Sequence, residues 1–331
     1  MDKLKDKLRG SFFIVNKIYL FIIFLFLTVS DITLGFVYFL ISIFIFIWKT
    51  LTYKVPMDVN CEIDVETFTY KETEEKDLKL DLYYPPNKTI NKYPLIYFCH
   101  GGGWISGFRN QPNNVSWCKY LASKGFIVSS IDYRYGFKND MDDILSDYTE
   151  GLEYLKKRSD ELGIDKDNVV LIGLSAGGHL SLLYASYHSF HKNNDKIQGI
   201  KAVVAYYSPS NLKDIFDSDN KSLFARFGTA ATLNGRPADI GEIYDYYSPI
   251  HWISEMMLPT LLVHGKLDDV VPFVSTVELV KRLKNFNVPC EFYVHKNAGH
   301  SFDTRLKDLT TINILEKTLR YLRKSVTGDN K

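Results

Sequence analysis

Short apolar runs alternate with segments of helical periodicity along most of the chain. Continuous apolar runs of about four to eight residues are typical of buried parallel strands, and apolar residues three or four positions apart indicate amphipathic helices. The alternation predicts an α/β fold in which a mostly parallel, eight-stranded sheet has helices on both faces. The expected strands lie at 62–70, 78–84, 94–99, 126–131, 168–172, 200–206, 259–263 and 290–294, and the expected helices at 117–123, 141–162, 179–185, 275–286 and 310–324.

Two regions depart from this alternation. The first two strands, 62–70 and 78–84, alternate polar and apolar residues, which favours an antiparallel edge of the sheet. Residues 207–258 interrupt the order of strands and helices and are too long for a plain loop, so we expect a small helical cap there. The cap is rich in aromatic residues. They either line an apolar acyl or alkyl pocket or pack the cap onto the sheet.

The N-terminal region has a different pattern. Residues 11–48 are almost entirely apolar, and a helix that spans a bilayer needs about 20 apolar residues. The segment is long enough for a hairpin of two short spans, or for one span preceded by an interfacial helix. A cleaved signal peptide fits less well because the run is too long, and a soluble core helix fits less well because no polar face is present. We therefore predict a basic flank at 1–10, a transmembrane segment at 11–48 that contacts the lipid bilayer, a linker at 49–59 and a globular domain at 60–325.

Basic residues flank the apolar segment on both sides. Lysine and arginine favour the cytosolic side of a membrane. Four of them precede the segment, and Lys49 and Lys54 follow it, which favours a hairpin with both ends in the cytosol. A single signal-anchor span would instead place the globular domain in the lumen or outside. We expect anchoring in an endomembrane such as the ER or Golgi with a cytosolic domain, and a lumenal domain is the alternative.

Composition and charge exclude several classes of protein. The chain has 331 residues, of which 46% are hydrophobic and 24% charged, and its formal net charge is +1. This composition excludes a disordered chain, and the neutral balance predicts no nucleic-acid partner. The four cysteines have no paired spacing, so they predict neither a metal site nor a dense disulfide framework. Free thiols fit best, and a single disulfide stays open.

A turn centred on a serine stands between a predicted strand and a predicted helix. Residues 173–178 have the sequence Gly-Leu-Ser-Ala-Gly-Gly. Ser175 has glycine two residues before and two residues after it, which fits a nucleophile elbow. Side chains at those two positions would collide with the strand and the helix, and glycine removes the clash. The alternative is a glycine-rich helix start that contains an ordinary serine.

A second glycine-rich loop follows the strand at 94–99. Residues 100–104 read His-Gly-Gly-Gly-Trp, which matches neither the dinucleotide-binding fingerprint nor the phosphate-binding P-loop. Glycines also let backbone N–H groups come within hydrogen-bond distance of a developing oxyanion. The loop is therefore a candidate oxyanion hole, and a plain flexible loop is the alternative.

An acid and a histidine complete the candidate catalytic set. A serine nucleophile needs a base, and the base needs an orienting carboxylate. In α/β sheets these groups lie at the C-terminal ends of strands, in the order serine, acid, histidine. Asp268 and Asp269 follow the strand at 259–263, and His300 follows the strand at 290–294. Both types of residue are therefore present where a triad with Ser175 requires them.

Several motifs together resemble one family. They are His-Gly-Gly-Gly-Trp at 100–104, Asp-Tyr-Arg at 132–134, the serine turn at 173–178, His-Gly-x-x-Asp-x-x-Val-Pro at 264–272 and Gly-His at 299–300. In this order they resemble the α/β-hydrolases of the esterase/lipase group over about residues 60–325. The resemblance implies the α/β-hydrolase fold and hydrolysis of a carboxylic ester through an acyl-enzyme, without a metal or organic cofactor.

The resemblance also implies a role for each motif residue. Ser175 is expected to be the nucleophile and His300 the general base. Asp268 is expected to orient His300, rather than Asp269, because the family places the acid four residues after the position of His264. His264 and His100 are expected to hold their loops by hydrogen bonds. The expected oxyanion-hole donors are the backbone N–H groups of Gly102, Gly103 and Ala176.

The substrate is less constrained. Many members of the group carry aspartate before the nucleophile, where this chain has Leu174. Together with Trp104, this resembles the feruloyl-esterase-like branch, which includes membrane-bound isoprenylcysteine methylesterases. The expected substrate is therefore a small lipophilic ester, with a prenylcysteine methyl ester as a specific hypothesis. The alternatives are an amidase, arylformamidase or lipid deacetylase on the same fold, or a non-catalytic binding protein.

Overall fold

The computed structural model describes residues 36–41, 44, 48, 52–86 and 91–327. The chain divides into two compact units, residues 1–53 and residues 54–331. The described residues of the first unit are mainly helical, and its apolar side chains Phe36, Ile41, Phe44 and Trp48 are exposed. No helix within these described ranges is long and apolar enough to cross a membrane. Most of the transmembrane segment expected at 11–48 lies outside them, so that expectation stays a prediction.

The second unit is built on an eight-stranded sheet with the strand order β1-β2-β4-β3-β5-β6-β7-β8. β1 pairs antiparallel with β2 and β2 pairs antiparallel with β4, whereas all other neighbours are parallel. The sheet is therefore mostly parallel, with the antiparallel edge that the alternating pattern predicts. The strands are β1 (Val65–Lys71), β2 (Leu78–Tyr83), β3 (Tyr93–Cys99), β4 (Ile127–Ile131), β5 (Ile164–Leu174), β6 (Ile200–Tyr206), β7 (Thr260–Gly265) and β8 (Cys290–His295).

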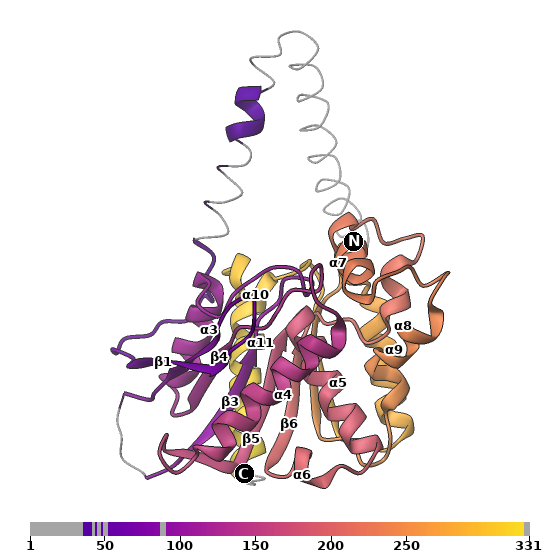
Figure 1. Ribbon diagram of the computed structural model, residues 1–331. Helices are drawn as coiled ribbons and strands as arrows, with labels where there is room; N and C mark the ends of the chain where they lie inside the picture. The colour runs from indigo at the N-terminus through magenta and orange to yellow at the C-terminus, as the bar shows by residue number, and fades with distance from the viewer. Residues whose placement is uncertain (1–35, 42–43, 45–47, 49–51, 87–90, 328–331) are drawn as a thin grey trace. The chain divides into compact units, whose positions relative to one another are not determined.

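Helices cover both faces of this sheet (Figure 1). Successive residues of a strand point to opposite faces, so Leu95 and Ile96 of β3 belong to two different buried clusters. The cluster of Ile96 includes Trp117 and Leu315, and the cluster of Leu95 includes Leu180. The helices are α3 (Pro112–Ala122), α4 (Met141–Lys157), α5 (Ala176–Phe190), α6 (Asn194–Ile197), α9 (Phe273–Asn285), α10 (Phe302–Arg305) and α11 (Leu309–Thr327). The four-residue helices α6 and α10 were not predicted, because a single turn is too short to repeat a pattern.

Four short helical elements lie between β6 and β7. They are η1 (Leu212–Phe216), α7 (Leu223–Leu233), α8 (Gly241–Tyr246) and η2 (Pro249–Trp252). α7 begins where the Ser222 side chain accepts a hydrogen bond from the N–H of Ala225, and it ends at Asn234 in a left-handed conformation. The aromatic residues of this region divide into two groups. Tyr244 is fully buried, whereas Phe224 is 49% exposed.

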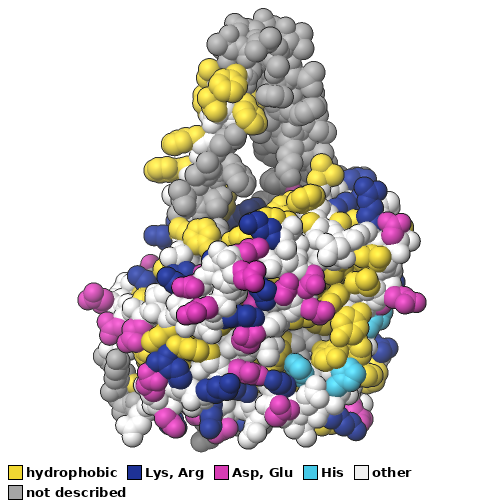
Figure 2. All heavy atoms as spheres, in the orientation of Figure 1, with side chains coloured by type: hydrophobic (Ala, Val, Ile, Leu, Met, Phe, Trp, Pro, Cys, Tyr) yellow, Lys and Arg dark blue, Asp and Glu magenta, His cyan; other side chains and the backbone are white. Residues whose placement is uncertain are grey.

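The surface carries charges of both signs. On the face drawn in Figure 2, acidic and basic side chains are interspersed over the sheet-and-helix unit, and hydrophobic side chains lie between them. This mixed pattern agrees with the formal net charge of +1.

Candidate active site

Ser175 occupies the turn between β5 and α5. Its backbone has φ 52° and ψ −117°, a strained conformation for a residue with a side chain. Gly177 lets this turn lie directly against β3, since a Cβ at that position would be 2.2 Å from the carbonyl oxygen of Cys99. The Ser175 N–H donates to the carbonyl oxygen of Tyr206 at 2.9 Å. The glycine pattern therefore fixes Ser175 at the C-terminal edge of the sheet, where α5 begins.

Three candidate catalytic side chains form a continuous hydrogen-bonded chain. The Oγ atom of Ser175 lies 3.1 Å from Nε2 of His300. The Nδ1 atom of His300 lies 2.8 Å from Oδ2 of Asp268. Asp268 follows β7 and His300 follows β8, so the side chains converge from three loops at one edge of the sheet. This geometry lets His300 accept a proton from Ser175 while Asp268 orients its ring.

Asp268 has a polar environment although its side chain is fully buried. Its Oδ1 accepts hydrogen bonds from the N–H groups of Val270 and Val271, at 2.8 and 2.9 Å. Its Oδ2 also lies 3.1 Å from Nε2 of His264. Burial raises the pKa of Asp268, but His300 and the hydrogen bonds from both histidines hold the pKa well below its ordinary value. The acid next to the serine–histidine pair is therefore ionised.

The glycine-rich loop lies across the serine turn. A Cβ on Gly101 would be 3.2 Å from the Cβ of Ser175. Gly102 and Gly103 have φ values of 128° and 61°, which favour glycine, and their N–H groups have no hydrogen-bond acceptor within the described part of the chain. Ala176 is the first residue of α5, so its N–H points out of the helix start. The loops around Ser175 thus supply the N–H groups that an oxyanion hole requires.

A segment after β4 supports the glycine-rich loop. Three hydrogen bonds join them: Tyr133 OH to the His100 carbonyl (3.2 Å), Tyr135 OH to the Gly107 carbonyl (2.5 Å) and Gly136 N–H to the Trp104 carbonyl (2.9 Å). The ring of Tyr133 also stacks on His100 with centroids 4.4 Å apart. Asp132-Tyr133-Arg134 carried a family resemblance in the sequence but no role. The structure shows that this segment positions the glycine-rich loop.

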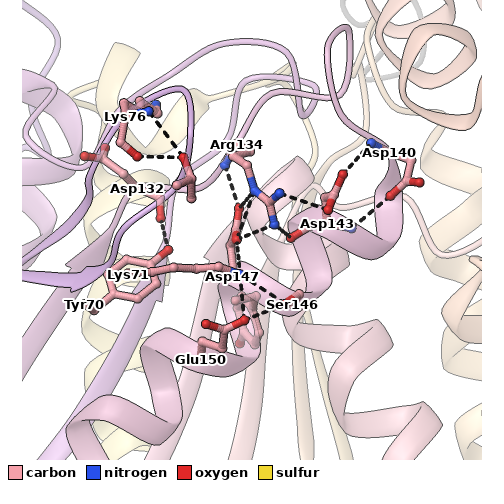
Figure 3. Close-up of polar contacts among 12 residues, drawn as sticks. Tyr70, Lys71, Lys76, Asp132, Arg134, Asp140, Asp143, Ser146, Asp147 and Glu150 are labelled. Atoms are coloured by element: carbon pink, nitrogen blue, oxygen red, sulfur yellow. Dashed lines mark hydrogen bonds and ion pairs between the residues drawn. The ribbon is translucent and has the colours of Figure 1, made fainter.

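Ion pairs join the same segment to α4, and they join α4 to β1 of the sheet (Figure 3). Arg134 forms ion pairs with Asp143 at 2.9 Å and with Asp147 at 2.8 Å. Lys71 of β1 reaches Asp147 at 2.9 Å and Glu150 at 2.6 Å. The side chain of Asp147 is fully buried, so both cations compensate a charge that water cannot reach.

An open cleft of about 780 Å³ lies over these ion pairs. Its walls are the turn at 72–75 and the start of α4, and they are mostly charged. None of Ser175, Asp268 and His300 lines it. We therefore do not place the reaction there, although it is much larger than the cavity beside Ser175.

A small, mostly apolar cavity opens beside Ser175. Its volume is about 20 Å³, which is space for about one or two water molecules. Trp104 and Ile215 contribute to its walls, and so does Phe224 of α7. The ring of Phe224 packs on the glycine-rich loop, 3.1 Å from the position that a Cβ on Gly103 would take. His300 does not line this cavity.

The other histidines have structural contacts. His264 holds the acid loop through Thr276 Oγ1 at 2.7 Å and through Asp268, and His100 lies 2.7 Å from the carbonyl of Gly101. The expectation that these two residues hold their loops agrees with these contacts. Burial lowers the pKa of His100 and of His179 to about 4, so both are neutral at pH 7. In the described part of the chain, no group of histidine, cysteine or acidic side chains could hold a metal ion.

The mostly parallel sheet and the position of Ser175 at its strand ends place the chain in the α/β-hydrolase class. The BD-FAE family model matches residues 80–283, which is more than half of the chain, so the protein belongs to the BD-FAE family. The predicted membership of the esterase group of α/β-hydrolases is confirmed.

Curated relatives and solved structures agree with this class. The chain is 25% identical to a probable isoprenylcysteine alpha-carbonyl methylesterase of Oryza sativa, over 70% of this chain and 55% of the relative. It is also 25% identical to the esterase LipC of Mycobacterium tuberculosis, over 68% of this chain and 57% of the relative. The chain thus spans just over half the length of these curated relatives.

Two solved esterases share the fold. Esterase B of Lactobacillus rhamnosis superposes with a TM-score of 0.71, at 22% identity, over 85% of this chain and 90% of that one. A thermophilic esterase of Thermogutta terrifontis superposes with a TM-score of 0.64, at 24% identity, over 81% of this chain and 95% of that one.

Proposed function

We propose that this protein is a serine carboxylesterase in which Ser175 is the nucleophile, His300 the general base and Asp268 the orienting acid. The observation that carries the proposal is the hydrogen-bonded chain from Ser175 Oγ through both ring nitrogens of His300 to Asp268, at 3.1 and 2.8 Å. Distances of this size suit proton transfer between a nucleophile and its base.

The reaction then has two steps. His300 takes the proton as Ser175 attacks the ester carbonyl, and the N–H groups of Gly102, Gly103 and Ala176 stabilise the tetrahedral oxyanion. His300 returns the proton to the leaving alcohol, and an acyl-enzyme remains. Water that gives its proton to His300 attacks this intermediate and releases the acid. The ionised Asp268 stabilises the imidazolium in both steps. No metal or organic cofactor is required.

The cavity beside Ser175 favours an ester with a short acyl group. With about 20 Å³ of free space, the cavity accommodates the methyl of an acetyl group without rearrangement. A longer chain would have to displace Phe224 or Ile215. The alcohol would extend past His300 toward solvent, where its size is less restricted. An acetylated or similarly short-acyl lipophilic alcohol fits this arrangement, which makes lipid deacetylation one form of the activity.

A prenylcysteine methyl ester is the second candidate substrate. The printed name of the rice relative, an isoprenylcysteine alpha-carbonyl methylesterase, supports it. In this ester the acyl side is large and the alcohol is methanol. The acyl group would have to extend outside the small cavity, so the two candidates predict opposite chain-length preferences.

We further propose that residues 11–48 anchor the enzyme in an endomembrane, with the catalytic domain in the cytosol. The apolar length of the segment and the basic residues on both sides support this. Anchoring beside the bilayer would raise the encounter with a lipophilic ester. Extraction with alkaline carbonate should leave the full chain in the membrane pellet. External protease should digest the domain in intact microsomes, and protection of the domain would contradict the cytosolic placement.

The activity is tested with the full chain in detergent. We expect hydrolysis of p-nitrophenyl acetate, weaker hydrolysis of the octanoate, and a loss of about 10⁴-fold or more in Ser175→Ala. Ser186→Ala is the matched control, because this buried serine of α5 bonds only the Leu183 carbonyl. Activity that survives in Ser175→Ala would refute the proposed nucleophile. Preference for S-farnesylcysteine methyl ester over the acetate would favour the second substrate.

A further inference from the structure

His300 has a second neighbour that the proposed mechanism does not use. The ring of Tyr207 lies against the imidazole, with ring centroids 4.5 Å apart and an angle of 58° between the planes. Tyr207 comes directly after β6, and its φ of 39° is in the left-handed region. A residue with a side chain rarely adopts this conformation unless its surroundings impose it.

Two hydrogen bonds hold Tyr207 in this position. Its N–H donates to the carbonyl oxygen of Val263 at 2.6 Å. Its hydroxyl donates to Oδ1 of Asp303 at 2.8 Å. The backbone and the far end of the side chain are therefore both fixed, and the ring between them lies against His300.

Asp303 is a buried acid three residues after His300. The residue has no exposed surface, and its Oδ2 accepts a hydrogen bond from Nε1 of Trp117 at 2.6 Å. Burial raises the pKa of Asp303 above its ordinary value, and the hydrogen bonds from Trp117 and Tyr207 together with the neighbouring His300 offset only part of this rise. An indole N–H can only donate, so Asp303 is an acceptor at this oxygen.

We propose that Tyr207 and Asp303 act as a positioning pair for His300. Tyr207 limits the rotation of the imidazole, and Asp303 both fixes Tyr207 and favours the protonated imidazole that forms when Ser175 attacks. The pair would add to the action of Asp268. This inference rests on the proposed role of His300 as the general base.

Other titratable groups also lie around His300. Asp268 bonds its Nδ1 and is itself paired with His264, and Ser175 bonds its Nε2. Tyr206, next to Tyr207, donates or accepts a hydrogen bond with Thr318 at 2.6 Å and has no ring contact with His300. These groups are unchanged when Tyr207 or Asp303 is replaced, so the effect of the pair can be isolated.

The test compares Asp303→Asn and Tyr207→Phe with the matched control Tyr184→Phe in the full chain, because the buried Tyr184 of α5 donates its hydroxyl to the Lys196 carbonyl at 3.0 Å. Removing the Asp303 charge makes protonated His300 less favourable, so His300 should lose its proton at lower pH. We expect the acidic limb of the kcat/KM profile for p-nitrophenyl acetate to move down by about half a pH unit or more in Asp303→Asn. We expect kcat to fall about 3- to 10-fold in Asp303→Asn and Tyr207→Phe. Tyr184→Phe also loses the hydroxyl of a buried tyrosine, yet it should move neither the limb nor kcat.

A measurement that does not depend on turnover separates this inference from the proposed function. Chains labelled with ¹³Cε1-histidine report the titration of each ring by NMR, and a His300→Gln sample assigns the signal. A lower midpoint in Asp303→Asn than in Tyr184→Phe supports the pair even if no tested ester is hydrolysed. Equal midpoints and superimposable pH profiles in the two variants would overturn it. An active enzyme with no such difference would leave the proposed function intact.

Discussion

The glycine-rich loop and the candidate base His300 both lie beside Ser175, and the protein holds them with different chemistry. On the loop side, Arg109 joins Asp81 and Asp132 at 2.9 and 2.6 Å, and Arg134 and Lys71 compensate Asp147. On the histidine side, the two side chains that donate hydrogen bonds to Asp303 are neutral: the indole of Trp117 and the phenol of Tyr207.

The two sides should therefore respond differently to salt and to small movements of their side chains. Ion pairs between partly exposed groups are screened by salt. Their geometry is well defined where the planar guanidinium of an arginine makes two hydrogen bonds at once. Buried hydrogen bonds from neutral donors are insensitive to salt, but leaving a buried acceptor without a donor is costly. The loop side therefore tolerates small movements of long side chains, whereas the histidine side fixes one ring geometry.

The largest expected effect is on the charged side. Asp147→Asn leaves Lys71 and Arg134 without their shared buried partner, and we expect a loss of about 3 kcal/mol in the free energy of unfolding. Urea denaturation followed by circular dichroism measures this loss. Asp160→Asn, at the exposed Lys92–Asp160 pair, is the control and should leave the transition unchanged. A similar midpoint in both variants would mean that the buried network does not stabilise this side.

A smaller effect is expected on the neutral side. Trp117→Phe removes the donor to Asp303, and we expect a loss of about 2 kcal/mol that is equal at 50 and 500 mM NaCl. The loss in Asp147→Asn should instead shrink at the higher salt, because Lys71 and Arg134 are 17% and 14% exposed. Trp252→Phe is the matched control, since its indole donates to the Tyr246 carbonyl at the surface. If the free energy of unfolding lost in Trp117→Phe depends on salt, the two sides do not differ in the way described.

The two sides also differ in how much of them the sequence could predict. The strands were predictable because a strand buried on both faces must be apolar, as residues 202–206 of β6 are. Ser175, Asp268 and His300 were predictable because each lies in a short motif at the end of a strand. The glycines around them were predictable because the close approach of two backbones leaves no room for a Cβ.

The supporting residues could not be predicted, because their partners are distant in sequence. Trp117 and Asp303 are 186 residues apart, and Tyr207 and Asp303 are 96 apart. Arg109, in the loop before α3, and Asp81 of β2 are 28 residues apart. Nothing in the local pattern of a buried tyrosine or tryptophan indicates which carboxylate it will meet. For the N-terminal segment, the composition supports the prediction of a membrane anchor. Residues 1–35 lie outside the described part of the chain, so the structure does not test it.

The smallest expected effect tests whether a positive charge at position 109 is sufficient to hold the glycine-rich loop. Arg109→Lys keeps the positive charge but loses the fork that bonds Asp81 and Asp132 together. Asp132 then holds Tyr133 less firmly, so the carbonyl of His100 and the N–H groups that follow it should be less well aligned. We expect kcat for p-nitrophenyl acetate to fall about 2- to 5-fold, with KM nearly unchanged, because the oxyanion forms only in the transition state. Arg158→Lys, distant from the loop and bonded to Glu161, is the control. An unchanged kcat in Arg109→Lys would show that a positive charge at this position is sufficient. The glycine-rich loop would then not need a fixed side-chain geometry like the one around His300.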